Sequence, residues 1–148
     1  MMARGPLLLL GVVCSGVAAL SVGGCSGVQP PKFELDRVER SVADGSLAIF
    51  IEATNNNDTP LPLRHARYRV ALDGERLFEG ERSPEVTVPA FSTVLFSLPA
   101  PIAGQPGEAI ELTGHVTYVE PGRLAEILFD SDVRQPEAPI RLEGEVGR

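Results

Sequence analysis

From Phe33 onward, apolar and polar residues alternate with a period of two, and helical periodicity is rare. Successive side chains of a β-strand point to opposite faces, so this alternation is typical of strands with one buried face. Gly, Pro, Asn and Asp interrupt the pattern about every 8–12 positions, as turns between strands do. The pattern predicts an all-β fold, an antiparallel sandwich of about seven or eight strands over residues 33–146.

Rows of alternating apolar residues define the predicted core. A first strand begins at Phe33 and Leu35, can include Val38, and precedes the turn residues Asp44-Gly45. Asp73-Gly74 is the strongest short signal for a tight hairpin in the chain. The inward rows of the later strands are Leu47, Ile49, Ile51 and Ala53; Ala66, Tyr68, Val70 and Leu72; Ile110, Leu112, Val116 and Tyr118; and Ile140, Leu142 and Val146.

Turn and breaker residues place the connections between these strands. Asn55–Asp58 ends the second strand, because Asn and Asp side chains bond to neighbouring backbone and tolerate left-handed conformations. The segment 60–63, with Pro60 and Pro62, is predicted to be an extended, non-helical connection before a third strand over residues 64–72. A later strand is expected over residues 91–98, and Gly114 is expected to permit a bulge.

One segment, residues 123–129, fits two structures. Leu124, Ile127 and Leu128 would share one face of a helix, yet seven residues are few for a stable helix. Both a strand and a single helical turn therefore stay open for this segment.

The first 24 residues have the order of a secretion signal. Arg4 provides the one positive charge near the start, Leu7–Leu20 is almost wholly apolar, and small residues follow at 21–24. An apolar run of 14 residues would form a helix of about 21 Å, which is shorter than a bilayer core of about 30 Å. Residues 1–24 are therefore predicted to be a cleaved signal peptide, not a permanent membrane span.

Cys25 follows this leader directly. The stretch Val22-Gly23-Gly24-Cys25 resembles the lipobox of bacterial lipoproteins, in which an aliphatic and two small residues precede a cysteine that receives lipid. The resemblance implies cleavage before Cys25 and acylation of its thiol; two or three acyl chains hold a protein firmly in a bilayer. An ordinary secretory leader with a chance cysteine is the alternative.

Residues 25–32 are predicted to form a tether between the acylated cysteine and the domain, stiffened by Pro30 and Pro31. In lipoproteins of two-membrane bacteria, Asp after the cysteine favours the inner membrane. Ser26 stands there in this chain, which favours an outer-membrane location facing the periplasm.

Charge and cysteine content exclude several classes of function. Without the leader, twelve basic and twenty acidic side chains remain, a net charge of −8, which argues against nucleic-acid binding. Cys14 and Cys25 are the only cysteines, so the domain has no thiol for a disulfide, a zinc site or a nucleophile. We therefore expect no cofactor.

The residues that could carry chemistry are few. His65 and His115 have no metal ligands at a suitable spacing on their strands, so no metal site is predicted, and there is no Gly-x-Ser-x-Gly turn. Glu79, Glu81 and Glu85 could act as paired carboxylates of a hydrolase, although a charged edge hairpin explains them better. Oxygen-rich loops could bind calcium, although turn formation explains them; they contain Asn55–Asp58, Asp73 and Asp130–Asp132.

Five motifs occur together in the domain: Ile49–Asn57, including the Asn55-Asn56-Asn57 turn; Leu61-Pro62-Leu63; Tyr68–Gly74, ending in Asp73-Gly74; Phe78–Gly80; and Val88–Thr93. With them the chain resembles the late embryogenesis abundant type 2 family, whose module is also called the water-stress and hypersensitive-response domain. The resemblance covers residues 33–146, and Asn56 departs from it because the family most often has proline there. It implies an immunoglobulin-like or fibronectin type III-like sandwich, linked in plants with desiccation or stress tolerance.

Two classes of function follow. We expect a non-enzymatic envelope lipoprotein with no catalytic residues, which holds to the lipid bilayer through Cys25 and shields or binds an envelope protein or other ligand. The alternative is a hydrolase of envelope polymers that uses the loop carboxylates.

Overall fold

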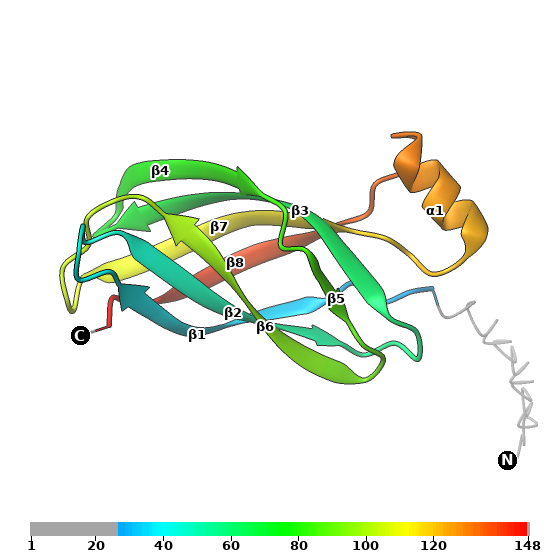
Figure 1. Cartoon of the computed structure of the whole chain (residues 1–148), viewed down its shortest axis with the longest axis horizontal. Helices are drawn as coiled ribbons and strands as arrows, with labels where there is room; N and C mark the ends of the chain where they lie inside the picture. The colour runs from blue at the N-terminus through cyan, green and yellow to red at the C-terminus, as the bar shows by residue number, and fades with distance from the viewer. Residues whose placement is uncertain (1–26, 148) are drawn as a thin grey trace, which may run out of the picture.

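The computed structural model describes residues 27–147, so the predicted leader, the lipobox residues Val22, Gly23 and Gly24, and Cys25 lie outside the described residues. The described part contains eight strands and one helix (Figure 1). The strands are β1 (Lys32–Arg40), β2 (Leu47–Asn55), β3 (Leu61–Leu72), β4 (Glu75–Arg82), β5 (Val86–Val88), β6 (Ser92–Ala100), β7 (Ala109–Tyr118) and β8 (Glu137–Glu145); the helix is α1 (Arg123–Asp130).

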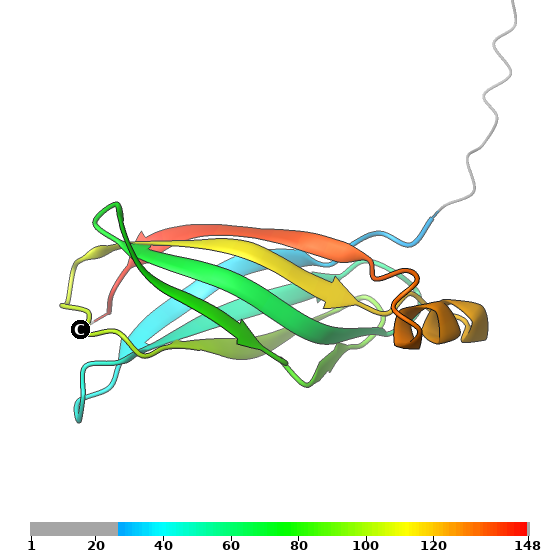
Figure 2. The same cartoon turned by 90° about the horizontal axis from the view of Figure 1, so that it is seen from above.

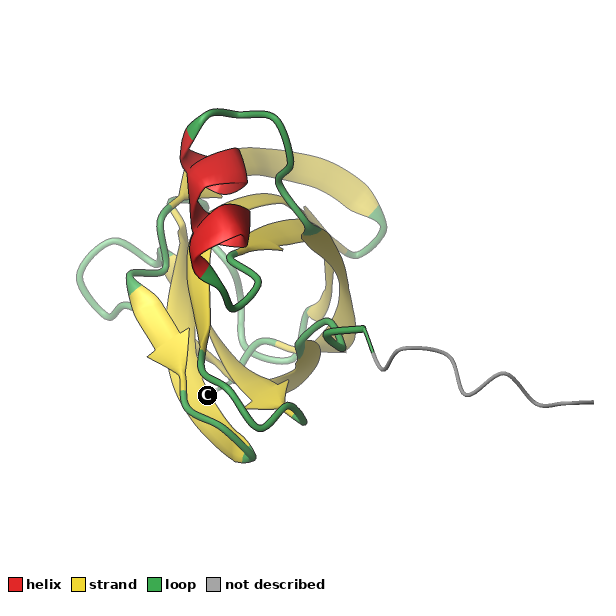
Figure 3. Cartoon of the chain, turned by 90° about the vertical axis from the view of Figure 1, so that its right-hand side faces the viewer, coloured by secondary structure: helices red, strands yellow, loops and turns green. Residues whose placement is uncertain are grey.

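The strands form two antiparallel sheets packed face to face (Figure 2). One sheet has the order β1-β2-β6, and the other has the order β4-β3-β7-β8 with β5 paired to the start of β3. This arrangement confirms the predicted all-β sandwich. Seen from one end, the sheets enclose the core and α1 lies outside them (Figure 3).

The predicted inward rows form this core. Ile49, Ile51 and Val70 are fully buried, and the rows of β7 and β8 are buried against them. Tyr68 links the two sheets, because its hydroxyl donates a 2.6 Å hydrogen bond to the carbonyl of Pro99 on β6. Burial of Tyr68 raises the pKa of its hydroxyl, which keeps this donor protonated.

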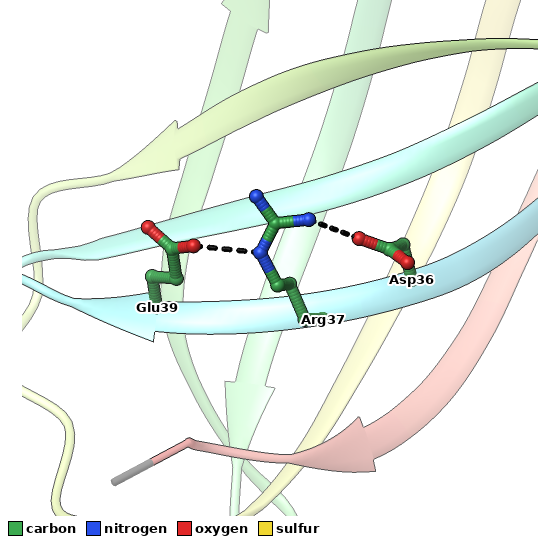
Figure 4. Close-up of polar contacts among 3 residues, drawn as sticks. All are labelled: Asp36, Arg37 and Glu39. Carbon is green, nitrogen blue, oxygen red and sulfur yellow. Dashed lines mark hydrogen bonds and ion pairs between the residues drawn. The ribbon is translucent and has the colours of Figure 1, made fainter.

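A bulge in β1 changes which side chains face the core. Leu35 pairs with Ile51 and Arg37 with Phe50, so the extra residue between them turns Val38 inward and Arg37 outward. On the outer face, Arg37 pairs with Asp36 and donates from Nε to Glu39 Oε1 at 2.6 Å (Figure 4). Its guanidinium lies 4.0 Å from the centre of the Phe50 ring. Hydrogen bonds to Glu39 and Asp36 raise the pKa of Arg37.

The segment 60–63 differs from its prediction as a connection outside the sheet. β3 begins at Leu61, and Leu61 and Leu63 pair with Val88 and Val86 of β5. Pro62 has no N–H to donate, but its carbonyl accepts a 3.0 Å hydrogen bond from the N–H of Val119. A proline is therefore tolerated at this position, because the neighbouring strand β5 is short and forms only a short ladder with β3.

Gly114 does not mark a bulge, since it pairs in register with Tyr68. A Cβ atom at Gly114 would lie 2.1 Å from the carbonyl oxygen of Arg67. Glycine is required here because the backbones of β3 and β7 approach closely, and the break in their register lies between Leu63 and Ala66 instead.

Residues 123–130 form a helix, which resolves the open alternative. Phe129 faces the domain and is buried, whereas Leu124 and Ile127 of the anticipated apolar face are exposed. Within residues 27–147 no helix is long and apolar enough to cross a bilayer.

The two ends of the sandwich have different contents. The entry end contains the first described residues (27–31), the β2–β3 turn (56–60), the β5–β6 turn (89–91) and α1 (Figures 1 and 3). The far end contains the β1–β2 turn (41–46), the β3–β4 turn at residues 73–74, the β6–β7 connection (101–108) and the C-terminus. The chain therefore enters the domain at the same end as its helix.

Candidate functional site

A buried asparagine organises the entry end. The side chain of Asn55, the last residue of β2, is fully buried. Its Nδ2 donates to the carbonyls of Thr59 at 2.8 Å and of Val88 and Pro89 at 3.1 Å. Its Oδ1 accepts from the backbone N–H of Asn57 at 2.9 Å and from the Asn57 Nδ2 at 2.8 Å. Asn55 thus joins the β2–β3 turn to the β5–β6 turn.

Asn57 extends this network to the start of the domain. The N–H of Gln29 donates to Asn57 Oδ1 at 2.8 Å, and Asn57 Nδ2 donates to the Gln29 carbonyl at 2.9 Å. Val28 packs against the core and Pro31 is buried. Residues 28–31, which we expected to belong to the tether, therefore lie on the domain and are held by hydrogen bonds and apolar contacts.

Phe91 projects from the same network. Its N–H donates a 3.0 Å hydrogen bond to the carbonyl of Asn57, yet its side chain is 72% exposed. Its φ of 49° is in the left-handed region, which is uncommon for a bulky residue and costs about 1–3 kcal/mol. The turn therefore holds an aromatic ring in solvent in a backbone conformation that the residue disfavours.

The helix adds apolar side chains and a small cleft to the entry end. Leu124 is 70% and Ile127 is 53% exposed, and Val133 in the following turn is 69% exposed. A cleft of about 250 Å³ lies between the helix and the segments before and after it. It is lined by Glu120, Pro121, Gly122, Leu124, Ala125, Leu128, Arg134 and Pro136.

One ion pair lines this cleft, and the buried side chain of Tyr118 comes just before it in the chain. Arg134 donates to Glu120 Oε1 at 3.1 Å, which links the segments that flank the helix. Burial, together with the charge of Glu120, raises the pKa of Tyr118 at the end of β7. The side chain of Tyr118 is therefore favoured as the neutral phenol.

The predicted hydrolase carboxylates have other partners. Glu79 pairs with Arg69, and Glu81 lies 3.3 Å from the Nε of Arg67. These pairs line a shallow, polar depression of about 720 Å³ on the outer face of the five-stranded sheet. Glu85 is exposed and lies beyond β4. The geometry is that of a charged outer strand, in which arginines neutralise the carboxylates.

The structure does not bring the predicted oxygen-rich loops together. Asn55–Asp58 and Asp130–Asp132 lie at the entry end, whereas Asp73 lies at the far end, where its Oδ1 accepts from the N–H of Ala109 at 3.1 Å. In residues 27–147 no group of three or more His, Cys, Asp or Glu side chains could hold a metal ion.

The two histidines have ordinary surface contacts. The backbone N–H of His65 donates to the hydroxyl of Thr117 at 3.1 Å, and its side chain is exposed. His115 is partly exposed, with its Nε2 3.5 Å from Glu137 Oε1 on β8.

The remaining residues of the family motif lie in turns or within a strand. Asn56 is exposed at the tip of the β2–β3 turn. Asp73 and Gly74 both have positive φ, at 48° and 83°, and form the tight β3–β4 hairpin in which Leu72 pairs with Glu75. Pro62 lies within β3.

Comparison with known proteins identifies the family. The family described as "Late embryogenesis abundant protein" matches residues 50–147. The chain belongs to this family. Among solved structures, a late embryogenesis abundant protein determined in solution superposes with a TM-score of 0.54 at 14% identity, covering 79% of this chain and 70% of that one.

A crystal structure of a protein from Archaeoglobus fulgidus gives a TM-score of 0.42 at 16% identity, covering 82% of this chain and 98% of that one. The comparison with curated proteins gives no match. Membership of the late embryogenesis abundant family suggests a stress-related, non-catalytic role.

Sequence reasoning missed two features of this end. The Asn57–Gln29 contact joins residues 28 positions apart, and no local pattern indicates it. Phe91 is predicted to begin the strand over residues 91–98, whereas β6 begins at Ser92 and Phe91 lies in the β5–β6 turn directly after Pro89-Ala90.

Proposed function

We propose that this late embryogenesis abundant domain is carried by a bacterial envelope lipoprotein. Acyl chains on Cys25 hold it to the membrane, and the domain acts without catalysis in protection against stress. The observation that carries the proposal is the lipobox-like Val22-Gly23-Gly24-Cys25 after a leader-like apolar run, only two residues before the described domain begins.

The domain is well suited to this arrangement. Its described residues contain no cysteine, so acylation chemistry would act on Cys25 without competing thiols in the body. Its first residues are held to the β2–β3 turn by Asn57, so an anchor at Cys25 would transmit its position directly to the sandwich. Ser26 favours the outer membrane, facing the periplasm.

The anchor is tested by substitution of each leader-region cysteine. Cys25→Ala should leave the protein unprocessed or release it from membranes, measured by fractionation and by the mass of the product. Cys14→Ala is the matched control, since that residue leaves with the leader and its loss should change neither readout. Full processing with unaltered membrane retention of Cys25→Ala would contradict the anchor.

The non-catalytic role is tested in cells. We propose that the sandwich surface shields or binds an envelope protein or another envelope ligand, and that deletion of the gene reduces survival of drying or osmotic stress. Cross-linking of intact envelopes followed by capture of the protein identifies the partner. Recovery of no protein, glycan or lipid, with unchanged survival of the deletion strain, would contradict this role.

A further inference from the structure

Four large apolar side chains are exposed at one end of the described domain, in two separate places, the β5–β6 turn and the helix with the turn after it. Phe91, Leu124, Ile127 and Val133 all lie in the β5–β6 turn, in α1 or directly after it, at the entry end. Among the side chains that the structure describes, the other large exposed apolar ones are Leu95 on β6 and Val42 at the far end. Single exposed apolar side chains are ordinary on a soluble domain, so what distinguishes these is that both places lie at the end where the chain enters the domain.

The start of the chain limits what this end can face. Cys25 precedes Gln29 by four residues, and an extended chain spans at most about 3.6 Å per residue, so their Cα atoms lie within about 14 Å. Gln29 is fixed to Asn57 by two hydrogen bonds. The Asn57 carbonyl also accepts from the N–H of Phe91. Acyl chains on Cys25 would therefore enter a bilayer close to the exposed Phe91 ring.

We propose that the entry end docks on the surface of the bilayer that holds acylated Cys25, with Phe91, Leu124 and Ile127 placed in the lipid interface. This inference rests on the proposed lipid anchor. An anchored domain is already at high local concentration near the bilayer, so a small apolar surface suffices to orient it. The strained backbone of Phe91 fits this role, because the turn holds the ring outward instead of burying it.

The charges of the entry end indicate whether docking should depend on the charge of the lipid headgroups. Arg123 lies beside Leu124, but the carboxylates of Glu126, Asp130 and Asp132 are also exposed on the helix or just after it. These carboxylates would oppose attraction to anionic headgroups. Docking is therefore apolar, and it should occur on vesicles of uncharged phosphatidylcholine and phosphatidylethanolamine.

The test measures which end of the anchored protein lies near lipid. The acylated full-length product is purified from membranes and reconstituted into such vesicles, with a single fluorescent label at Asp58→Cys on the entry end or Ala43→Cys on the far end. Both positions are exposed, and after acylation of Cys25 the introduced cysteine is the one free thiol. A headgroup-borne nitroxide should quench the label at position 58 several-fold more strongly than the label at position 43.

Variants separate apolar docking from mere closeness of the tether. The triple variant Phe91→Asn, Leu124→Gln and Ile127→Gln should lower quenching at position 58 toward the level at position 43. Asn suits a positive φ and Gln is a good helix former, so these changes should leave the fold intact, checked by urea unfolding. Val42→Gln, which replaces a 97% exposed side chain at the far end, is the matched control and should change nothing.

The outcomes distinguish this inference from the anchor itself. Equal quenching at both ends, or quenching unaffected by the triple variant, in protein whose mass shows acyl chains on Cys25 would overturn docking and leave the anchor standing. A second outcome is that the label at position 58 becomes shielded from water as the protein-to-lipid ratio rises but is not quenched by the lipid-borne nitroxide. That result would overturn docking on lipid in favour of contact with a second copy of the chain. Protein that lacks acyl chains and does not sediment with vesicles would remove the anchor and the docking with it.

Discussion

Asn55 shows how far a single residue can be interpreted from its sequence context. The run Asn55–Asp58 predicted a turn after the second strand, and the turn is present. The depth of Asn55 in the core and its bonds to Val88 and Pro89 could not be predicted, because those partners lie more than 30 positions away. Long-range side-chain contacts depend on how sheets pack, which local patterns do not specify.

Replacing Asn55 by Ala should destabilise the domain by about 2–4 kcal/mol, because three buried or half-buried carbonyls lose their donor. The free energy of unfolding in urea measures the effect. Asn56→Ala is the control, since Asn56 is exposed and its loss should cost at most about 0.5 kcal/mol. Equal effects of the two substitutions would refute the structural role assigned to Asn55.

Tyr68 makes a second prediction at this scale. Burial raises its pKa above the ordinary value of 10.0, so the folded state holds the proton more tightly than the unfolded state does. The contribution of Tyr68 to the free energy of unfolding is fully present below pH 10.0 and is lost as the pH rises through the folded pKa. Tyr68→Phe should therefore weaken the alkaline loss of stability, and it should cost about 1 kcal/mol at neutral pH through the lost bond to Pro99.

Ultraviolet absorbance of phenolate checks the tyrosine prediction directly, because the chain has only Tyr68 and Tyr118. The wild-type protein should show both residues titrating above pH 10.0, since the pKa of each is raised. A step of one tyrosine at an ordinary pKa that disappears in Tyr68→Phe would contradict the buried hydroxyl.

At the scale of elements, alternation predicted most strands and their inward faces. It failed at Leu61–Leu63, which belong to β3, and at Phe91, which lies in the turn before β6. The bulge of β1 before Arg37 was not predicted in either direction. For residues 123–129 the pattern allows a strand or a helical turn, because seven residues are few for a stable helix. In the structure Leu124 and Ile127 of the expected apolar face are exposed, and Phe129 anchors the helix. Periodicity shows which side chains share a face but not whether that face is covered.

The close approach of the β3 and β7 backbones at Gly114 can be tested by substitution. Gly114→Ala should destabilise the domain by about 1–3 kcal/mol, since the new methyl group would lie 2.1 Å from the Arg67 carbonyl oxygen unless the strands separate. Urea unfolding measures it. Gly27→Ala is the control, because a Cβ there meets nothing within 4 Å. A neutral Gly114→Ala would show that the strands lie farther apart than described.

At the scale of the whole molecule, the sandwich was accessible from sequence, since turn spacing and alternation extend over the entire domain. The family was accessible through the resemblance of its motifs. The grouping of the chain start, the Asn55–Asn57 network, Phe91 and α1 at one end was not. These parts come from four separate stretches of sequence, and only the order of strands in the two sheets brings them together. The proposed orientation on a membrane depends on that grouping.

The central claim is that Cys25 becomes an acylated N-terminus that holds a thiol-free sandwich at a bilayer. Mass spectrometry of the mature protein, purified from bacterial membranes, tests it most directly. The account predicts that residues 1–24 are absent and that the first peptide carries a diacylglyceryl group on Cys25. An unmodified Cys25, or a leader still attached in healthy cells, would contradict it.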